Sequence, residues 1–193
     1  LKVGIIGVGG LRQCHGDASG RVEEAKVIAI SDPNTVKLKD VGDRYGICNQ
    51  YRQASELIAD DKLDAVVICT PNVFHPELSV EALKAGRHVL CEKPLALTTR
   101  EIEKVLDVAA RSDQVFMGAM CWRFMAPSAA FKAYVESDKA GELYYARASY
   151  MRRRGIPGLG GWFTTRKLAG GGALCDVGVH VLDLCVWMMG NPE

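Results

Sequence analysis

Residues 3–10 read VGIIGVGG, an apolar run that ends in closely spaced glycines. The apolar residues predict a buried strand, and Gly7 and Gly9 predict a tight turn that leads into a helix. Similar runs follow at residues 25–31, 63–69, 88–91 and 115–118. Helix-like segments separate these runs, at residues 11–24, 34–45, 55–59, 74–85 and 98–111. Apolar runs are typical of parallel strands covered on both faces, so we expect a doubly wound parallel α/β sheet.

The pattern changes after about residue 120. Residues 129–136 are expected to form a helix, and the alternation over residues 143–152 predicts a half-buried strand. Residues 174–189 carry an apolar stripe at helical spacing, although Val177, Val179 and Val181 also alternate as in a strand. About 16 residues exceed the length of an ordinary strand, so we expect a helix that ends at Gly190.

Composition narrows the class of protein. The chain has 193 residues and a net charge of +1, which gives no general attraction to nucleic acid or to a membrane surface. No uninterrupted apolar run approaches the roughly 20 residues of a membrane helix. The seven cysteines are scattered without a C-x-x-C pair, which argues against a zinc site and against a disulfide framework. We therefore expect a cytoplasmic protein with no bound metal and with neither nucleic acid nor a membrane as partner.

The glycine turn has a physical use. Gly7 and Gly9 let a pyrophosphate approach the backbone, and the following helix would offer N–H donors. Asp32 ends the second predicted strand 25 residues after Gly7, where a carboxylate can accept both ribose hydroxyls and would repel a 2′-phosphate. This spacing favours NAD over NADP. The alternative is an ordinary turn followed by an aspartate that caps a helix.

Polar residues follow two further predicted strands. They are Thr70-Pro71-Asn72 and Glu92-Lys93-Pro94. Open α/β sheets bind ligands at the carboxyl ends of their strands, so Lys93 can reach a substrate hydroxyl there, although it can also be a surface lysine.

Asp176 and His180 are four residues apart, on one face of the predicted helix. A carboxylate and an imidazole so placed can exchange a proton with a bound hydroxyl. The alternative is a core helix whose histidine caps a neighbouring element.

Six motifs together resemble the Gfo/Idh/MocA oxidoreductases, the family of glucose–fructose oxidoreductase and inositol dehydrogenase. The motifs are Gly7-x-Gly9-Gly10, Asp32-Pro33, Thr70-Pro71-Asn72-x-x-His75, Cys91-Glu92-Lys93-Pro94, Trp122-Arg123-Phe124 and the block from Gly171 to Asp183. The resemblance covers essentially the whole chain. It implies an NAD(P)-binding Rossmann domain at residues 1–120. It also implies, at residues 121–193, the N-terminal part of an α+β substrate and dimerisation domain with a mostly antiparallel sheet.

The resemblance also implies roles for individual residues. The catalytic set would be Lys93, Asp176 and His180, and the substrate would contact Arg123, Trp162 and Asp176. The cofactor would contact Gly7, Gly9, Gly10, Leu11, Asp32, Thr70, Pro71, Asn72, His75, Glu92 and Lys93. His15 falls where relatives often carry a histidine. Arg12 replaces a small residue of the fingerprint, and Cys121 stands where relatives often have Asn.

The implied activity is that of an NAD-dependent dehydrogenase acting on a secondary hydroxyl of a sugar, polyol or related compound. Two alternatives stay open: a regulator that senses NAD without turning it over, and an inactive fragment that only binds nucleotide. Family members usually continue well beyond this length, so we expect the chain to be incomplete and the full-length protein to form a homo-oligomer.

Two features of the second half have more than one interpretation. The arginines at 152–154 could grip an anionic substrate, or they could form a solvated strand end or an interface. Trp162 could stack on a sugar ring, or it could pack against the first domain.

Cys91 and Cys175 have no identifiable base beside them and are interpreted as small apolar residues.

Overall fold

A computed structural model describes residues 1–9, 22–137, 139–151, 153 and 160–190. The chain divides into two compact units, Leu1–Gly118 and Ala119–Glu193. Each unit is described by itself. The expected helix over residues 11–24 lies mostly outside the described residues, and residues 22–24 lie outside any helix.

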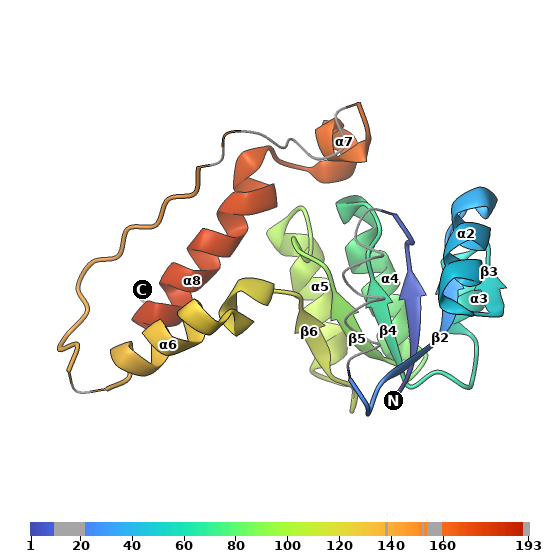
Figure 1. Ribbon diagram of the computed structural model, residues 1–193, viewed down its shortest axis with the longest axis horizontal. Coiled ribbons are helices and arrows are strands. Elements are labelled where there is room, and N and C mark those ends of the chain that lie inside the picture. Colours follow the sequence, from blue (N-terminus) through green and yellow to red (C-terminus); the bar gives the residue numbers. More distant parts are fainter. Residues whose placement is uncertain (10–21, 138, 152, 154–159, 191–193) are drawn as a thin grey trace. The chain divides into compact units, whose positions relative to one another are not determined.

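The first unit is built on a six-stranded sheet in which all neighbouring strands are parallel (Figure 1). The strand order is β3-β2-β1-β4-β5-β6, so the chain moves outward from β1 in both directions. The strands are β1 (Lys2–Ile6), β2 (Lys26–Ser31), β3 (Asn49–Tyr51), β4 (Ala65–Ile68), β5 (His88–Cys91) and β6 (Phe116–Gly118). This doubly wound sheet confirms the predicted fold class and creates a crevice beyond the carboxyl ends of β1 and β4.

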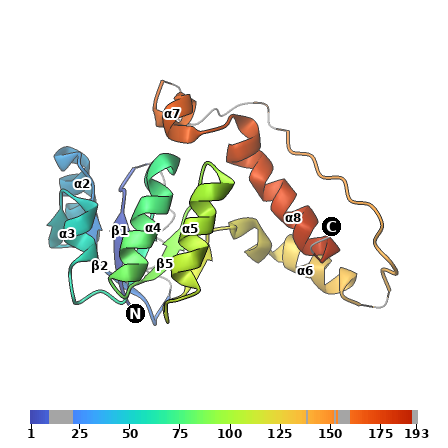
Figure 2. The same ribbon diagram turned by 180° about the vertical axis from the view of Figure 1, so that it is seen from behind.

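Helices connect these strands and cover the sheet. They are α2 (Thr35–Tyr45), α3 (Ala54–Ile58), the short 3₁₀ helix η1 (Asn72–Phe74), α4 (His75–Lys84) and α5 (Thr99–Ala109). Figure 2 shows α4 and α5 side by side over the sheet. Local signals set several ends: the Asn34 side chain accepts from the Lys37 N–H at the start of α2, and Gly46 ends it in the left-handed region.

The apolar side chains of the strands pack into two hydrophobic cores, one on each face of the sheet. Ile5 and Val67 belong to the core that α2 covers, whereas Ile6 and Val66 belong to the core beneath α3, α4 and α5. Because successive residues of a strand point to opposite faces, a strand buried on both sides must be apolar throughout. The continuous runs in the sequence follow from this burial.

One strand was not predicted. β3 contains only Asn49, Gln50 and Tyr51, and it pairs with β2 at the edge of the sheet. Its residues are polar or only half-buried, so the sequence has no apolar run that would predict this strand.

All the regular secondary structure described in the second unit is helical. Its elements are the 3₁₀ helix η2 (Cys121–Phe124), α6 (Ala126–Val135), the 3₁₀ helix η3 (Trp162–Thr164), α7 (Arg166–Ala169), the π-helix η4 (Leu174–Gly178) and α8 (Val179–Met189). The predicted helix over residues 174–189 is confirmed, with a wider π turn over its first five residues. By length and composition alone, Arg166–Met189 could also cross a membrane, but apolar core helices of soluble proteins share that property.

The strand predicted over residues 143–152 is wrong for the part that the structure describes. Residues 142–151 carry no secondary structure and are exposed. A strand requires a hydrogen-bonded neighbour, and none of the described residues of this unit supplies one.

Candidate active site

The glycine turn lies directly after β1, at the carboxyl edge of the sheet. Gly7 has a φ of 91°, and a Cβ added to it would lie 2.7 Å from the carbonyl oxygen of Cys69. Only glycine fits this position without strain. A Cβ on Gly9 would meet no atom of the described residues within 4 Å, so these residues leave room beside Gly9 for a ligand. Gly10 and Leu11, with Arg12 and His15, lie outside the described residues.

Asp32 borders the candidate site at the carboxyl end of β2. Its carboxylate accepts hydrogen bonds from the backbone N–H of Val8 at 3.0 Å and of Asn34 at 2.9 Å. These bonds hold the carboxylate beside the glycine turn. Because each carboxylate oxygen has two lone pairs, Asp32 keeps acceptor capacity for the hydroxyls of a ribose.

A hollow lies next to Asp32, at the carboxyl end of β3. Its lining residues are Pro33, Gln50, Tyr51, Arg52, Gln53 and Glu56. Arg52 was not among the predicted site residues, because the strand that it directly follows was not predicted. A guanidinium here is the group that would attract a phosphate on the ribose, which opposes the preference that Asp32 sets.

The residues after β4 offer polar groups that fit a ligand. Thr70 Oγ1 is buried and has no hydrogen-bond partner among the described residues. Such a buried hydroxyl is costly unless something satisfies it, and a cofactor bound along this edge would do so. Pro71 is half-buried, and Asn72 is 5% exposed and begins η1. The described residues therefore fit a dinucleotide at the crevice beyond β1 and β4.

His75 is completely buried and contacts two loops of the site, and the cofactor contact that the resemblance implied for it stays a prediction. Its Nδ1 lies 2.7 Å from the carbonyl oxygen of Pro94, and its Nε2 lies 2.9 Å from that of Thr70. Burial lowers the pKa of His75, although both carbonyls oppose the shift. With no exposed surface of its own, His75 supports the site through the two loops that it links.

The loop after β5 carries Glu92 and Lys93. Glu92 is buried, and its Oε2 lies 3.2 Å from the backbone N of Lys93, which donates to it. Lys93 is half-buried and is joined to Pro94 by a cis peptide bond. Cys91 just before them is inaccessible, and burial raises the pKa of its thiol to about 12. A thiol that stays protonated is inert, in line with its interpretation as a small apolar residue.

In the second unit, His180 is almost buried on the first turn of α8. Its imidazole stacks on the indole of Trp122, with ring centroids 4.9 Å apart and planes 9° apart. Tyr150 packs on Trp122 at 5.3 Å in a tilted arrangement. Asp176 lies one turn earlier, within the π-helix η4, and is half-buried. The stack between Trp122 and His180 was not predicted, because the two residues are far apart in sequence.

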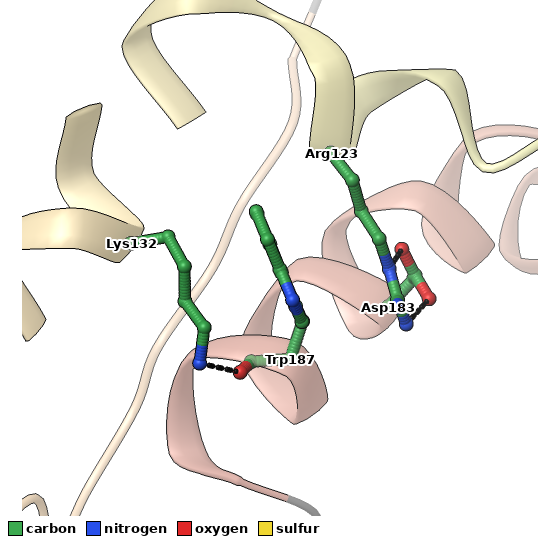
Figure 3. A network of polar contacts seen from close by, with 4 residues as sticks. All are labelled: Arg123, Lys132, Asp183 and Trp187. Atoms are coloured by element: carbon green, nitrogen blue, oxygen red, sulfur yellow. Dashed lines mark hydrogen bonds and ion pairs between the residues drawn. The ribbon is translucent and has the colours of Figure 1, made fainter. Parts of the chain in front are cut away.

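Arg123 lies next to Trp122 and forms a two-point ion pair with Asp183 of α8. Nε and Nη2 of Arg123 lie 2.8 and 2.5 Å from the two carboxylate oxygens (Figure 3). The hydrogen bond to Asp183 raises the pKa of the guanidinium, which stays charged. The substrate contact implied for Arg123 stays a prediction, and the structure gives this side chain a structural partner.

Trp162 begins η3 and stacks on Phe163 at 3.8 Å, and both are half-buried. Arg153 is exposed, whereas Arg152 and Arg154 lie outside the described residues. Among the described residues, no group of three or more His, Cys, Asp or Glu side chains is placed to hold a metal ion. The convergence of Lys93 with Asp176 and His180 stays a prediction, because they belong to different units.

Comparison with known proteins settles the family. Residues 1–119 match the oxidoreductase family with an NAD-binding Rossmann fold, and residues 128–193 match a Gfo/Idh/MocA C-terminal domain. The chain belongs to the Gfo/Idh/MocA oxidoreductase family. Its resemblance to that family, first inferred from six motifs, is thereby confirmed.

Two curated relatives illustrate the chemistry of the family. The D-glucoside 3-dehydrogenase of Escherichia coli (strain K12) is 32% identical over 193 residues, which is 100% of this chain and 55% of that protein. The levoglucosan dehydrogenase of Pseudarthrobacter phenanthrenivorans is 30% identical over 203 residues, covering 99% of this chain and 52% of that protein. The chain thus spans about half the length of these relatives.

Solved structures give the same fold with a cofactor present. GenD2 from gentamicin A biosynthesis in complex with NAD has a TM-score of 0.86 and 25% identity, covering 100% of this chain and 54% of that one. Levoglucosan dehydrogenase in complex with NADH has a TM-score of 0.83 and 27% identity, covering 98% and 54%. NAD is therefore the cofactor that this family fold binds, as expected from Asp32.

Proposed function

We propose that this chain is the cofactor-binding and catalytic part of a dehydrogenase that oxidises a secondary ring hydroxyl of a sugar or cyclic polyol with NAD. The observation that carries the proposal is the pairing of two features. The crevice edge has an open glycine turn beside a fixed carboxylate, and the second unit holds a nearly buried histidine. The relatives include a D-glucoside dehydrogenase, a levoglucosan dehydrogenase and a myo-inositol dehydrogenase, which supports a sugar or cyclic polyol as substrate.

The first unit would hold the cofactor. Asp32 accepts hydrogen bonds from the ribose hydroxyls, Gly9 leaves room for the pyrophosphate, and Thr70 offers its buried hydroxyl. Bound NAD supplies the hydride acceptor. Asp32 favours NAD over NADP by repelling a 2′-phosphate, and Arg52 is the nearby residue that limits this preference.

The remaining chemistry concerns one proton and one developing charge. His180 takes the proton of the substrate hydroxyl while the carbon that bears this hydroxyl gives up a hydride to NAD. The alcohol thus loses one proton and one hydride and becomes a ketone. Lys93 donates a hydrogen bond to the same oxygen and stabilises the negative charge that develops on it. Asp176, one turn before His180, orients the substrate or the imidazole.

The test is NADH formation by the complete protein across a panel of methyl glucosides, 1,6-anhydro sugars and inositols. His180→Ala should lower kcat by about 10²-fold or more while leaving the Kd for NAD within a factor of about three, and Lys93→Met should lower kcat to a similar extent. Turnover that survives His180→Ala would sink the catalytic assignment. Binding of NAD with no reduction on any compound would favour the alternative of a regulator that senses NAD.

Two further properties belong to the proposal. All described cysteines are free thiols, which supports action in the reducing cytoplasm. Relatives carry further sequence beyond the length matched here, and we propose that the complete protein forms a homo-oligomer. Its mass by light scattering, compared with its mass by mass spectrometry, tests that point.

A further inference from the structure

Trp122 and Arg123 are neighbours on η2, and both contact the first turns of α8. Trp122 stacks on the ring of His180, and Arg123 pairs with Asp183, three residues further along the helix. The two contacts are of different kinds, one aromatic and one ionic. Both contacts are made to the short stretch of α8 that carries His180.

The ion pair fixes the helix rather than the ring. Its two-point geometry restrains both rotation and sliding of α8 against η2, because a planar guanidinium and a planar carboxylate must stay aligned. Asp183 is only 12% exposed in its side chain, so water competes little for it. The Arg123 guanidinium also lies 5.6 Å from the centre of the Trp187 ring, one turn further along α8 (Figure 3).

The aromatic stack fixes the ring rather than the helix. An imidazole on a helix can rotate about its side-chain bonds, and a general base must present one nitrogen to the substrate. Planes only 9° apart leave the His180 ring flat against the indole. Tyr150 also contacts this indole, in a tilted arrangement.

We propose that Trp122 and Arg123 are positioning residues for His180: Trp122 sets the plane of the imidazole, and Arg123, through Asp183, sets the helical turn that carries it. This inference rests on the proposed function, in which His180 is the base. It adds two residues that act through His180 and need no contact with the substrate.

Lys132 provides a matched control. It also ties a neighbouring helix to α8, because its Nζ donates to the carbonyl oxygen of Trp187 at 2.8 Å, and it lies 5.5 Å from the same indole (Figure 3). That contact is two turns away from His180. Removing it weakens the packing of α8 without touching the turn that bears the imidazole.

The experiment compares Trp122→Leu, Trp122→Phe, Arg123→Met, Arg123→Lys and Lys132→Met in the complete protein. We expect Trp122→Leu and Arg123→Met to lower kcat about 10- to 100-fold, because small displacements of a catalytic group are costly. Trp122→Phe should restore most of kcat, and Arg123→Lys should not, since an ammonium cannot form the two-point pair. Lys132→Met should leave kcat within about threefold, and no variant should change the Kd for NAD.

Two further measurements separate positioning from stability. In the His180→Ala background, Trp122→Leu should lower kcat no further, because a residue that acts through His180 has nothing left to position. Nuclear magnetic resonance of ring-labelled histidine should show His180 protons shifted upfield by the Trp122 ring current, and Trp122→Leu should abolish that shift.

The outcomes distinguish this inference from the proposed function. Equal losses of kcat in Arg123→Met and Lys132→Met, or His180 resonances unmoved by Trp122→Leu, would overturn the positioning role. If His180→Ala keeps full turnover, the proposed function fails instead, and the resonances of His180 still decide whether Trp122 holds its ring.

Discussion

Gly7 and Gly9 sit two residues apart in the same turn, yet the structure predicts opposite consequences for the same substitution. Alanine at position 7 would place a Cβ 2.7 Å from the Cys69 carbonyl oxygen and 2.8 Å from its carbonyl carbon, at a φ of 91°. Alanine at position 9 meets no described atom within 4 Å, and its φ lies outside the left-handed region. The first substitution is a problem for folding and the second for binding.

The magnitudes follow from those contacts. Backbone strain at positive φ costs a residue with a Cβ about 1–3 kcal/mol. The clash with the Cys69 backbone, directly after β4, should add a similar amount, because the ends of two packed strands cannot shift freely. We therefore expect Gly7→Ala to lower the free energy of unfolding by about 3 kcal/mol. For a urea m-value of about 2 kcal/mol per molar, the midpoint falls by about 1.5 M.

Gly9→Ala should leave that midpoint within about 0.3 M of the parent. Its methyl group instead occupies the space through which the pyrophosphate approaches, so the Kd for NAD should rise at least tenfold, equivalent to about 1.4 kcal/mol. Urea unfolding followed by circular dichroism and NAD titration by calorimetry measure the two effects. A Gly7→Ala protein as stable as the parent, or a Gly9→Ala protein that binds NAD equally well, would refute the reasoning.

Three other predictions follow from single residues. Asp32→Ser should weaken NAD at least tenfold and narrow the preference for NAD over NADP, measured by the Kd of each nucleotide. Burial lowers the pKa of His75 in the folded protein, so as the pH falls this histidine takes up a proton in the unfolded chain before it does so in the folded one. The stability that neutral His75 contributes is therefore fully present above the unfolded pKa of about 6.5 and is lost as the pH falls below it. The urea midpoint should therefore drop between pH 7.5 and 5.5, and less so in His75→Gln. Iodoacetamide at pH 8 should alkylate Cys48 and Cys121 and spare Cys91, as read by peptide mass spectrometry; rapid labelling of Cys91 would mean that its site opens.

Much of the first unit was predictable because its signals are local or repeat within a few residues. Apolar runs identified five of the six strands, and the polar edge strand β3 left no such run. Helix ends followed from short motifs: the Thr98 side chain accepts from the Glu101 N–H at the start of α5, and Glu101 accepts in return. Such caps need no partner from elsewhere in the chain.

Some features of the candidate site were likewise predictable from local signals, and others depend on the packed fold. Gly7 and Asp32 were identified from spacing, and the structure places the Asp32 carboxylate on the backbone of Val8 beside that turn. The burial of His75 was not predictable, because it depends on carbonyl groups from two loops that only the packed sheet brings together.

The sequence by itself determined the family, the parallel sheet and the residue types at each strand end, because those depend on periodicity and short motifs. Tertiary structure decided which side chains meet. Arg123 and Asp183 lie 60 residues apart and carry no local signal of their pairing. The segment at 143–152 alternates like a strand but has no neighbour to bond with in the described residues. Ion pairs, stacks and strands all need a second partner, and a partner distant in sequence is supplied only by the fold.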